Sequence, residues 1–264
     1  MKRTAMLLAL TVSVIILCSC SSGGAAPKEP SSPDHAGEEQ SSQGKTASSG
    51  QMSSGQNHSD IEEINAWGDS ITQGYGSDGL SYPEVLEQLT GIPVRNFGEG
   101  GEDSTEILAR SLAYGPQKED ILVIQMGDNG GWKDLDELIG QYRRLIDAAG
   151  TDRYIIISST DDPDDFVQIW GYTNEPVGLE DTWYEAQFRE AFGDHLLIGR
   201  KYLIEHGLAI NGLEETEEDR ARAIKGNISL QMRNPEIDNT HLNEAGYTAL
   251  AQGVYEKGKE LGYW

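Results

Sequence analysis

The segment DILVIQMGDNGG, residues 120–131, contains a continuous apolar run that stops at a glycine and is followed by polar and glycine residues. A short uninterrupted run of this kind, bounded by turn residues, is typical of a strand that is buried on both faces. Such strands occur in parallel sheets whose two faces are covered by helices. The segment therefore predicts a central strand of an α/β domain, with a polar loop at its carboxyl end.

Similar apolar runs occur on both sides of this segment, and longer helical patterns separate them. The expected strands are residues 64–67, 94–97, 120–127, 153–160 and 195–199, and the expected helices are residues 82–89, 105–114, 135–149 and 243–261. Strands that alternate with helices predict a parallel sheet with helices on both faces. The carboxyl ends of such strands form one edge of the sheet, where α/β proteins bind their ligands.

Four of the loops expected at this edge carry hydroxyl, amide, carboxylate or imidazole side chains. GDSIT follows the first strand, NFGEGGEDST the second and GDNGG the third, while DNTH precedes the last helix. The topology therefore gathers Ser70, Asn129, Asp238 and His241 along one edge, together with glycine-rich turns.

These residue types are the ones that acyl transfer requires. A serine hydroxyl is a weak nucleophile until a neighbouring base removes its proton. We expect His241 to be that base, and Asp238 to fix the tautomer of His241 and stabilise the imidazolium. The oxyanion that develops on the carbonyl needs hydrogen-bond donors that are already in place. The candidate donors are the backbone N–H groups of Ser70 and Gly101 and the side-chain amide of Asn129.

The same four segments resemble the sequence blocks of the SGNH hydrolases, also called GDSL-type esterases. GDSIT is similar to the first block, with the nucleophile at Ser70, and GGEDST to the second, with its glycine at Gly101. GDNG resembles the third block, with its asparagine at Asn129, and DNTH resembles the last, with Asp238 and His241. The resemblance covers residues 65–264. It implies a flavodoxin-like, three-layer α/β/α fold with a five-stranded parallel sheet.

The sequence departs from this pattern in the third block. The block usually reads Gly-x-Asn-Asp, whereas Gly130 follows Asn129 here. The family's aspartate at that position is supportive rather than catalytic, so the departure bears on the geometry of the loop more than on the chemistry. Trp132, just beyond the block, is the aromatic residue that we expect to contact the substrate.

Each motif on its own also has a structural interpretation. GDS is a common turn, and an asparagine such as Asn129 often stabilises one. The joint order of the four motifs favours the catalytic interpretation, because His241 is the only histidine with an acid three residues before it. We expect His195 to be a half-buried structural residue beside a strand, and His206 to lie at the negative end of a helix.

Two acidic runs lie outside these motifs. Residues 161–165, DDPDD, are the kind of oxygen cluster that calcium prefers, but a solvated turn is the simpler interpretation. Residues 214–219, EETEED, predict the exposed start of a helix, where acids suit the helix dipole. Aromatic residues crowd the region after the fourth strand, either as a substrate pocket or as packing. They are Phe166, Trp170, Tyr172, Trp183 and Tyr184.

Residues 1–20 have the pattern of a secretory signal peptide, with two basic residues followed by an apolar run to Leu17. Leu17-Cys18-Ser19-Cys20 also resembles a bacterial lipobox, which implies cleavage before Cys20 and attachment of lipid to it. An ordinary signal peptide is the alternative. Residues 21–60 contain no Val, Ile, Leu or aromatic residue and predict a disordered tether. The catalytic domain is expected to span residues 61–264.

Composition narrows the classes of function. The chain has 20 basic and 44 acidic residues and a net charge of −24, which disfavours nucleic acid and anionic lipid as partners of the folded part. Both cysteines lie within residues 1–20, so the domain has no thiol nucleophile, disulfide or cysteine-based zinc site. We expect no metal or organic cofactor.

The sequence thus predicts a serine esterase that is lipid-anchored outside the cytoplasm of a bacterium. The leading substrates are O-acetyl groups of a carbohydrate. A lipase or lysophospholipase is one alternative. A surface glycan-binding protein whose catalytic geometry has decayed is an alternative of another class, and Gly130 is the feature that favours it. The oligomeric state is left open.

Overall fold

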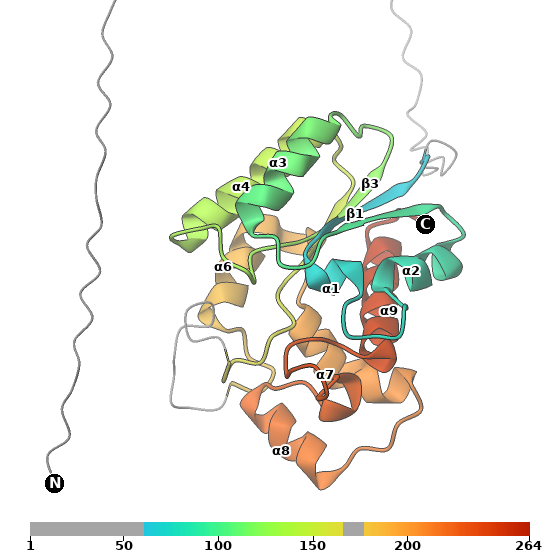
Figure 1. The fold of residues 1–264 in the computed structure, drawn as a ribbon, viewed down its shortest axis with the longest axis vertical. Helices are drawn as coiled ribbons and strands as arrows, with labels where there is room; N and C mark the ends of the chain where they lie inside the picture. The colour runs from blue at the N-terminus through green and yellow to red at the C-terminus, as the bar shows by residue number, and fades with distance from the viewer. Residues whose placement is uncertain (1–60, 166–176) are drawn as a thin grey trace, which may run out of the picture. The chain divides into compact units, whose positions relative to one another are not determined.

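The computed structural model of the chain describes residues 61–165 and 177–264. Within these ranges five strands form one parallel sheet in the order β2-β1-β3-β4-β5. Figure 1 labels the neighbouring strands β1 and β3 of this sheet. The parallel sheet expected from the alternation of strands and helices is confirmed. The strands are β1 (Ile64–Gly68), β2 (Val94–Gly98), β3 (Ile121–Gln125), β4 (Tyr154–Ile157) and β5 (Leu196–Leu197).

Helices follow each strand in turn. Among the described residues, none of them combines the length and the apolar character needed to cross a membrane. The predicted signal peptide, Cys20 and the tether lie outside the described residues, as do Phe166, Trp170 and Tyr172. The described helices are α1 (Ser70–Gln73), α2 (Tyr82–Thr90), α3 (Ser104–Tyr114), α4 (Leu135–Ala149), α6 (Trp183–Phe192), α7 (Gly199–Ile210), α8 (Glu217–Lys225) and α9 (Glu244–Glu260), with short 3-10 turns at Gly193–His195 and Leu230–Met232.

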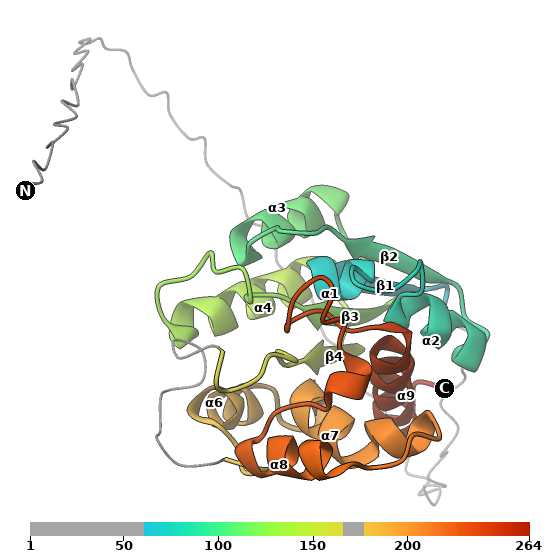
Figure 2. The same ribbon diagram turned by 60° about the horizontal axis from the view of Figure 1, so that its bottom comes forward.

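Alternate side chains of the strands point to opposite faces of the sheet. On one face, the strand residues that share a buried cluster with α2, α7 and α9 are Ile64, Ala66, Ile121, Val123, Ile155, Ile157 and Leu197. On the other face, the strand residues that share a buried cluster with α3, α4 and α6 are Trp67, Leu122, Ile124, Ile156 and Leu196. The helices thus form a layer on each side of the sheet (Figure 2), and the three-layer α/β/α fold is confirmed.

Local sequence explains where several helices begin. In a capping box, the side chain of the residue before the helix accepts a hydrogen bond from the backbone N–H three residues later. The side chain of that later residue in turn accepts a hydrogen bond from the backbone N–H of the residue before the helix. This arrangement sets the start of α3 at Ser104, one residue before the predicted start. The pairs that form capping boxes are Ser81 with Glu84, Asp103 with Glu106, Thr182 with Glu185, and Thr216 with Asp219.

Two features differ from expectation, the length of β5 and the exposure of the acidic run that leads into α8. The strand expected at residues 195–199 contains only Leu196 and Leu197, because the residue before them ends a 3-10 turn and Gly199 begins α7. The acidic run at residues 214–219 is not wholly exposed. Asp219 in α8 is 6% exposed, since it accepts hydrogen bonds from Ser229 and Gln231.

Two histidines that competed with His241 in the sequence have structural surroundings. His195 is half-buried, as predicted, and its ring stacks on Tyr154 with its Nδ1 2.9 Å from the Tyr154 carbonyl oxygen. His206 lies beside Tyr202 in α7, before the last turn of that helix rather than at its end.

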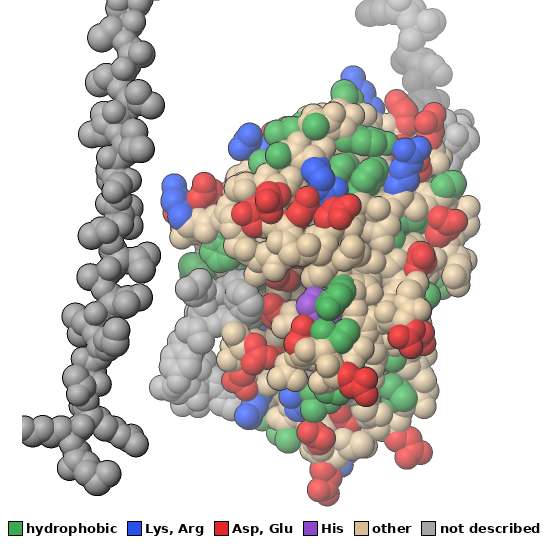
Figure 3. Space-filling view, viewed as in Figure 1, with side chains coloured by type: hydrophobic (Ala, Val, Ile, Leu, Met, Phe, Trp, Pro, Cys, Tyr) green, Lys and Arg blue, Asp and Glu red, His purple; other side chains and the backbone are tan. Residues whose placement is uncertain are grey.

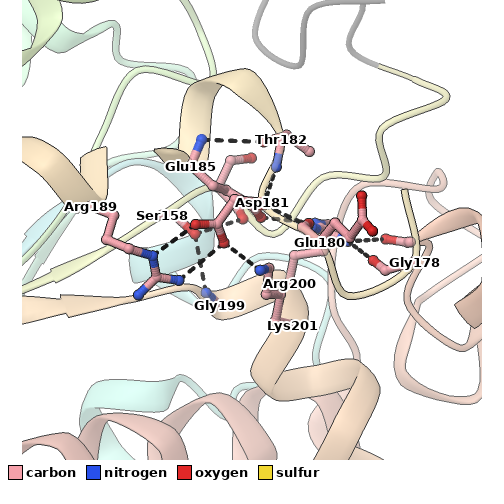
Figure 4. A network of polar contacts seen from close by, with 12 residues as sticks. Ser158, Gly178, Glu180, Asp181, Thr182, Glu185, Arg189, Gly199, Arg200 and Lys201 are labelled. Atoms are coloured by element: carbon pink, nitrogen blue, oxygen red, sulfur yellow. Dashed lines mark hydrogen bonds and ion pairs between the residues drawn. The ribbon is translucent and has the colours of Figure 1, made fainter. Parts of the chain in front are cut away.

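A buried ion pair joins α6 to α7 (Figure 4). Two guanidinium nitrogens of Arg200 donate to the two carboxylate oxygens of Glu185, at 2.9 and 2.7 Å, and neither side chain is exposed. Arg200 also donates to the carbonyl oxygens of Gly178, Glu180 and Gly226. Because two buried charges are costly to desolvate, these bonds decide whether the pair is tolerated.

We predict that Arg200→Ala lowers the free energy of unfolding by about 3–5 kcal/mol, because it leaves the Glu185 carboxylate buried and unpaired. Chemical denaturation of both proteins measures the difference. Arg220→Ala is the matched control, since it breaks an ion pair with Glu215 in which both side chains are 53% exposed. The control should cost no more than about 1 kcal/mol. Equal losses in the two variants would contradict a structural role for the buried pair.

Candidate active site

Ser70 lies at the carboxyl end of β1, as the first residue of the short helix α1. Asp69 caps this helix, because its Oδ1 accepts a hydrogen bond from the backbone N–H of Ile71 at 3.0 Å. The serine therefore lies where the chain turns from strand to helix. Its backbone N–H is one of the first in the helix, and these have no acceptor within the helix.

Two glycines allow α1 to lie directly against the strand ends. A Cβ atom at Gly68 would lie 2.1 Å from Oγ1 of Thr72, and a Cβ at Gly98 would lie 2.1 Å from the backbone nitrogen of Gln73. No side chain larger than hydrogen fits at either position without moving α1. This close contact fixes the height of the nucleophile segment above the sheet.

Ser70, His241 and Asp238 form a continuous chain of polar contacts. Nε2 of His241 lies 2.9 Å from Oγ of Ser70, and its Nδ1 lies 2.7 Å from Oδ2 of Asp238. The His241 side chain is 15% exposed, and Figure 3 shows a histidine side chain reaching the surface on the face drawn. The structure thus brings together the three residues that the sequence placed at this edge.

The Asp238 carboxyl is held in its ionised form. Burial opposes ionisation, but hydrogen bonds outweigh it and keep the pKa of Asp238 below its ordinary value. Its Oδ1 accepts from the backbone N–H groups of His241 and Thr240, at 2.8 and 2.9 Å, while Oδ2 faces the imidazole. A carboxylate in this position favours a proton on Nδ1 of His241 and leaves Nε2 free to accept one.

A buried arginine that the sequence analysis missed fixes the loop before α9. Arg233 is 1% exposed, and its guanidinium donates to the carbonyl oxygens of Thr240 and Thr160 and to the carboxylate of Asp162. Asn243 caps α9, and its amide also donates to the carbonyl oxygens of Gln231 and Arg233. An arginine inside an irregular segment gives no periodic signal, so its role becomes visible only in three dimensions.

The segment after α1 packs on the other side of His241. The Tyr75 ring meets the imidazole edge-on, with centroids 4.7 Å apart, and is 51% exposed. A Cβ atom at Gly76 would lie 2.8 Å from Cβ of His241. Asn234 joins the two segments, since its side chain donates to the Gly76 carbonyl at 2.6 Å and its N–H to the His241 carbonyl at 3.1 Å. Tyr75 was not among the predicted site residues.

The residues expected to bind an oxyanion lie on two neighbouring loops. The loop that carries Gly101 passes close to the nucleophile, because a Cβ at Gly100 would lie 3.8 Å from Cβ of Ser70. Gly101 has φ +84°, a conformation that suits glycine. The Asn129 amide donates to the Glu102 carbonyl at 3.0 Å, which joins the two loops. An amide group has two hydrogens, so one donor of Asn129 is left for a ligand.

Gly130 and Trp132 have structural contacts. The Gly130 carbonyl accepts hydrogen bonds from the N–H and the hydroxyl of Ser104, at 3.1 and 2.9 Å, and so holds the first turn of α3. The Trp132 indole donates to the Gly127 carbonyl at 2.8 Å, and its ring packs against the cluster under α3 and α4. Contact between Trp132 and a substrate stays a prediction.

Two of the aromatic residues expected near the site are described. Tyr184 is 1% exposed and stacks on Phe188 with centroids 4.2 Å apart, so it belongs to the core. Trp183, at the start of α6, is 53% exposed. Of the two interpretations left open by the sequence, packing is correct for Tyr184.

The acidic run at residues 161–165 is the solvated turn that we expected only in its second half, where Asp164 and Asp165 are exposed. Asp161 and Asp162 are 1% and 2% exposed, because the chain turns inward after β4. Asp162 pairs with Arg222 and Arg233, whereas the oxygens of Asp161 have no hydrogen-bond partner within residues 61–165 and 177–264. Among the described residues, no group of three or more His, Cys, Asp or Glu side chains has the arrangement that holds a metal ion.

Carboxyl groups next to the nucleophile and next to Asn129 are difficult to ionise. Burial, with a contribution from the charge of Asp161, raises the pKa of Asp69 to about 7. Burial, with a contribution from Asp69, raises the pKa of Asp128 to about 8. The pKa of Asp161 is also raised well above its ordinary value, by burial and by the charge of Asp128.

No protein-family model and no curated protein matches the sequence. Among solved structures, protein YxiM of Bacillus subtilis is similar over 76% of this chain and 57% of its own length, with 19% identity and a TM-score of 0.51. A G-D-S-L family lipolytic protein of Desulfitobacterium hafniense is similar over 74% of this chain and 99% of its own, with 16% identity and a TM-score of 0.48. A G-D-S-L family member of Veillonella parvula has 16% identity over 74% of this chain and 96% of its own, with a TM-score of 0.40.

The chain shares the fold of the YxiM structure, a parallel sheet with a layer of helices on each face. Within this fold, the segments that resemble the four blocks follow β1, β2 and β3 and precede α9. The likeness concerns the fold, because the identities are low. What the site does chemically must be argued from the contacts of its own residues.

Proposed function

We propose that the protein is a serine esterase of the SGNH type. The observation that supports this most strongly is the chain of contacts from Ser70 Oγ through the His241 imidazole to the Asp238 carboxylate, at 2.9 and 2.7 Å. A nucleophile in contact with a base, and a base in contact with a group that orients it, is the arrangement that nucleophilic catalysis requires. These three side chains lie at the edge of the sheet and are partly exposed, so a substrate can reach them.

In the proposed reaction, Ser70 Oγ attacks the ester carbonyl carbon while its proton passes to Nε2 of His241. Asp238 stabilises the imidazolium that results. The carbonyl oxygen becomes an oxyanion, which accepts hydrogen bonds from the N–H groups of Ser70 and Gly101 and from the Asn129 amide. His241 then gives its proton to the leaving alcohol. A water molecule, deprotonated by His241, releases the acid from the acyl-serine and restores the hydroxyl.

We predict that the protein hydrolyses p-nitrophenyl acetate, and that Ser70→Ala lowers kcat by at least about 10³ because the nucleophile is lost. Asp238→Asn should lower kcat by about 10³–10⁴, since the amide no longer favours a proton on Nδ1 of His241. Steady-state kinetics measures both effects. Circular dichroism checks that each variant is folded.

Glu236→Gln is the matched control for Asp238→Asn. It removes a carboxylate charge from the same loop, but its side chain is exposed. Its kcat should stay within about a factor of two of the parent, because an exposed charge is screened by salt. Equal rates in the parent and in Ser70→Ala would rule out Ser70 as the nucleophile. A folded protein that binds glycans and hydrolyses no ester would support the non-catalytic alternative.

We further propose that the substrate is an acetylated carbohydrate. A cavity reaches Asn239, the residue that follows Asp238, and its lining is mostly charged or amide side chains. Hydroxyl groups of a sugar can hydrogen-bond to such a lining. A long acyl chain would instead displace water from these polar side chains without offering them hydrogen bonds, which is unfavourable. The residues that line this cavity include Asp162, Asp164, Asp165, Arg222, Lys225 and Asn227.

We predict that kcat/KM falls as the acyl chain of a p-nitrophenyl ester lengthens from acetyl to octanoyl, and that acetate is released from O-acetylated polysaccharides. The reason is that the polar cavity does not compensate for ordering a long apolar chain. Ser70→Ala, assayed in parallel, removes background hydrolysis. A kcat/KM that rises steadily with chain length would instead support the lipase or lysophospholipase alternative.

We also propose that the protein is anchored to a bacterial membrane by lipid on Cys20, with residues 21–60 as a tether. The proposal relies on the sequence pattern, because these residues lie outside the described ranges. Expression in bacteria supplied with a labelled fatty acid should label the parent and leave Cys20→Ala unlabelled, while Cys18→Ala should retain the label. Label that persists in Cys20→Ala would refute the assignment.

A further inference from the structure

Three carboxyl groups that the proposed reaction does not use lie beneath the site. Asp69 precedes Ser70, Asp128 precedes Asn129, and Asp161 follows β4. Asp69 and Asp161 are each 1% exposed, and Asp128 is half-buried. Their charges interact with one another, Asp161 with Asp69 and with Asp128. The carboxyl groups therefore form one cluster that contacts both the nucleophile segment and the Asn129 loop.

Gln125, at the end of β3, bridges two members of this cluster. Its Nε2 donates to Oδ2 of Asp128 at 2.8 Å and lies 3.5 Å from Oδ2 of Asp69. The bridge links the residue before the proposed nucleophile to the residue before the proposed oxyanion donor. The two carboxyl groups that Gln125 bridges thus belong to the residues directly before Ser70 and Asn129.

Several acceptors of the cluster lack a donor. Among the described residues, both carboxylate oxygens of Asp161 and the Oε1 atom of Gln125 are buried without a hydrogen-bond partner. A buried acceptor without a donor costs about 1–3 kcal/mol, and a buried unpaired charge costs more. Protonation of a carboxyl group supplies a donor and removes a charge at the same time. The described residues offer no metal-binding group that would do the same.

The groups that face the cluster do not neutralise it. Its positive neighbour is Arg233, whose two terminal nitrogens are bonded to Asp162 and to two carbonyl oxygens, while its Nε has no partner among the described residues. Asp162 and Asp165 add negative charge beside Asp161. The remaining neighbours are phenols whose pKa values are raised, mainly by burial, so they stay uncharged. They are Tyr82, Tyr142, Tyr184 and Tyr247.

We propose that Asp69, Asp128 and Asp161 together retain a proton at neutral pH, and that this proton holds the Ser70 segment and the Asn129 loop in their relative positions. The three residues are positioning residues, because they act through the residues that follow them. Retention of the proton does not depend on whether the protein hydrolyses esters. Only its effect on catalysis rests on the proposed function. When the proton leaves at alkaline pH, repulsion between the carboxylates separates the two loops.

The direction of the pH dependence follows from proton binding. The folded-state pKa values of Asp69 and Asp128 are raised from 3.8 to about 7 and about 8. Between about pH 4 and pH 8 the folded state therefore binds more protons than the unfolded state. These groups make the stability fall as pH rises through that window, and the loss is complete above it.

The direct test is ¹³C NMR of the aspartate carboxyl carbons in the full chain, with Asp161→Asn and Asp164→Asn as assignment variants. We expect at least one of the three cluster resonances to have the shift of a protonated carboxyl at pH 7, and to move to the carboxylate shift as pH rises. If all three residues are ionised at pH 6, the proposal is overturned.

The second test compares melting temperatures at pH 5 and pH 8. Asp161→Asn removes one charge from the cluster, so it should raise Tm by about 3–5 °C more at pH 8 than at pH 5. Asp164→Asn is the control from the same turn, since its side chain is 60% exposed, and it should shift Tm alike at both pH values. An Asp161→Asn shift that does not differ between the two pH values refutes the proposal.

Activity separates this proposal from the proposed function. In the parent we expect kcat to decline at alkaline pH as the cluster loses its proton, and the decline to be smaller in Asp161→Asn. If the protein hydrolyses no ester while the NMR and Tm results hold, the retained proton stands and the proposed function fails. If hydrolysis is normal while the carboxyl groups ionise below pH 6, the proposed function stands and this inference fails.

Discussion

The hydrogen bond between Ser70 and His241 is the contact on which the site depends, because it joins residues 171 positions apart in the sequence. Neither side chain can be moved far without losing it. On the serine side, the contact requires α1 to lie directly on the ends of β1 and β2, which only glycine at positions 68 and 98 permits. On the histidine side, it requires the loop before α9 to be held by Arg233. The nucleophile segment and the loop before α9 are thus joined through the two side chains that the reaction requires.

Much of the polar structure around this contact is costly. Arg233 and Asp162 are nearly fully buried, and the buried Asp161 oxygens have no hydrogen-bond partner in the described part of the chain. Such groups lower stability unless other contacts offset the cost. The apolar clusters on both faces of the sheet supply that stability. Costly groups gathered beneath one edge of an otherwise apolar framework are consistent with an edge whose role is chemical.

The sequence predicted the sheet, the order of its elements and the grouping of Ser70, Asp238 and His241, because apolar periodicity and chain topology determine them. It missed Arg233 and Tyr75, which act through contacts across the fold and leave no local pattern. It also misread the start of the acidic run after β4. Composition favoured a solvated turn for Asp161 and Asp162, but both are buried. Burial of a carboxyl group depends on tertiary partners, and the local sequence does not reveal them.

The central claim is that Ser70 is a nucleophile served by His241 and by donors on the neighbouring loops. A crystal structure of the protein after reaction with a phosphonate ester tests it most directly. The account predicts a covalent bond from Ser70 Oγ to phosphorus, with a phosphonyl oxygen within hydrogen-bonding distance of the Gly101 N–H and the Asn129 amide. An unmodified Ser70, or an adduct whose oxygen contacts neither of these donors, would contradict it.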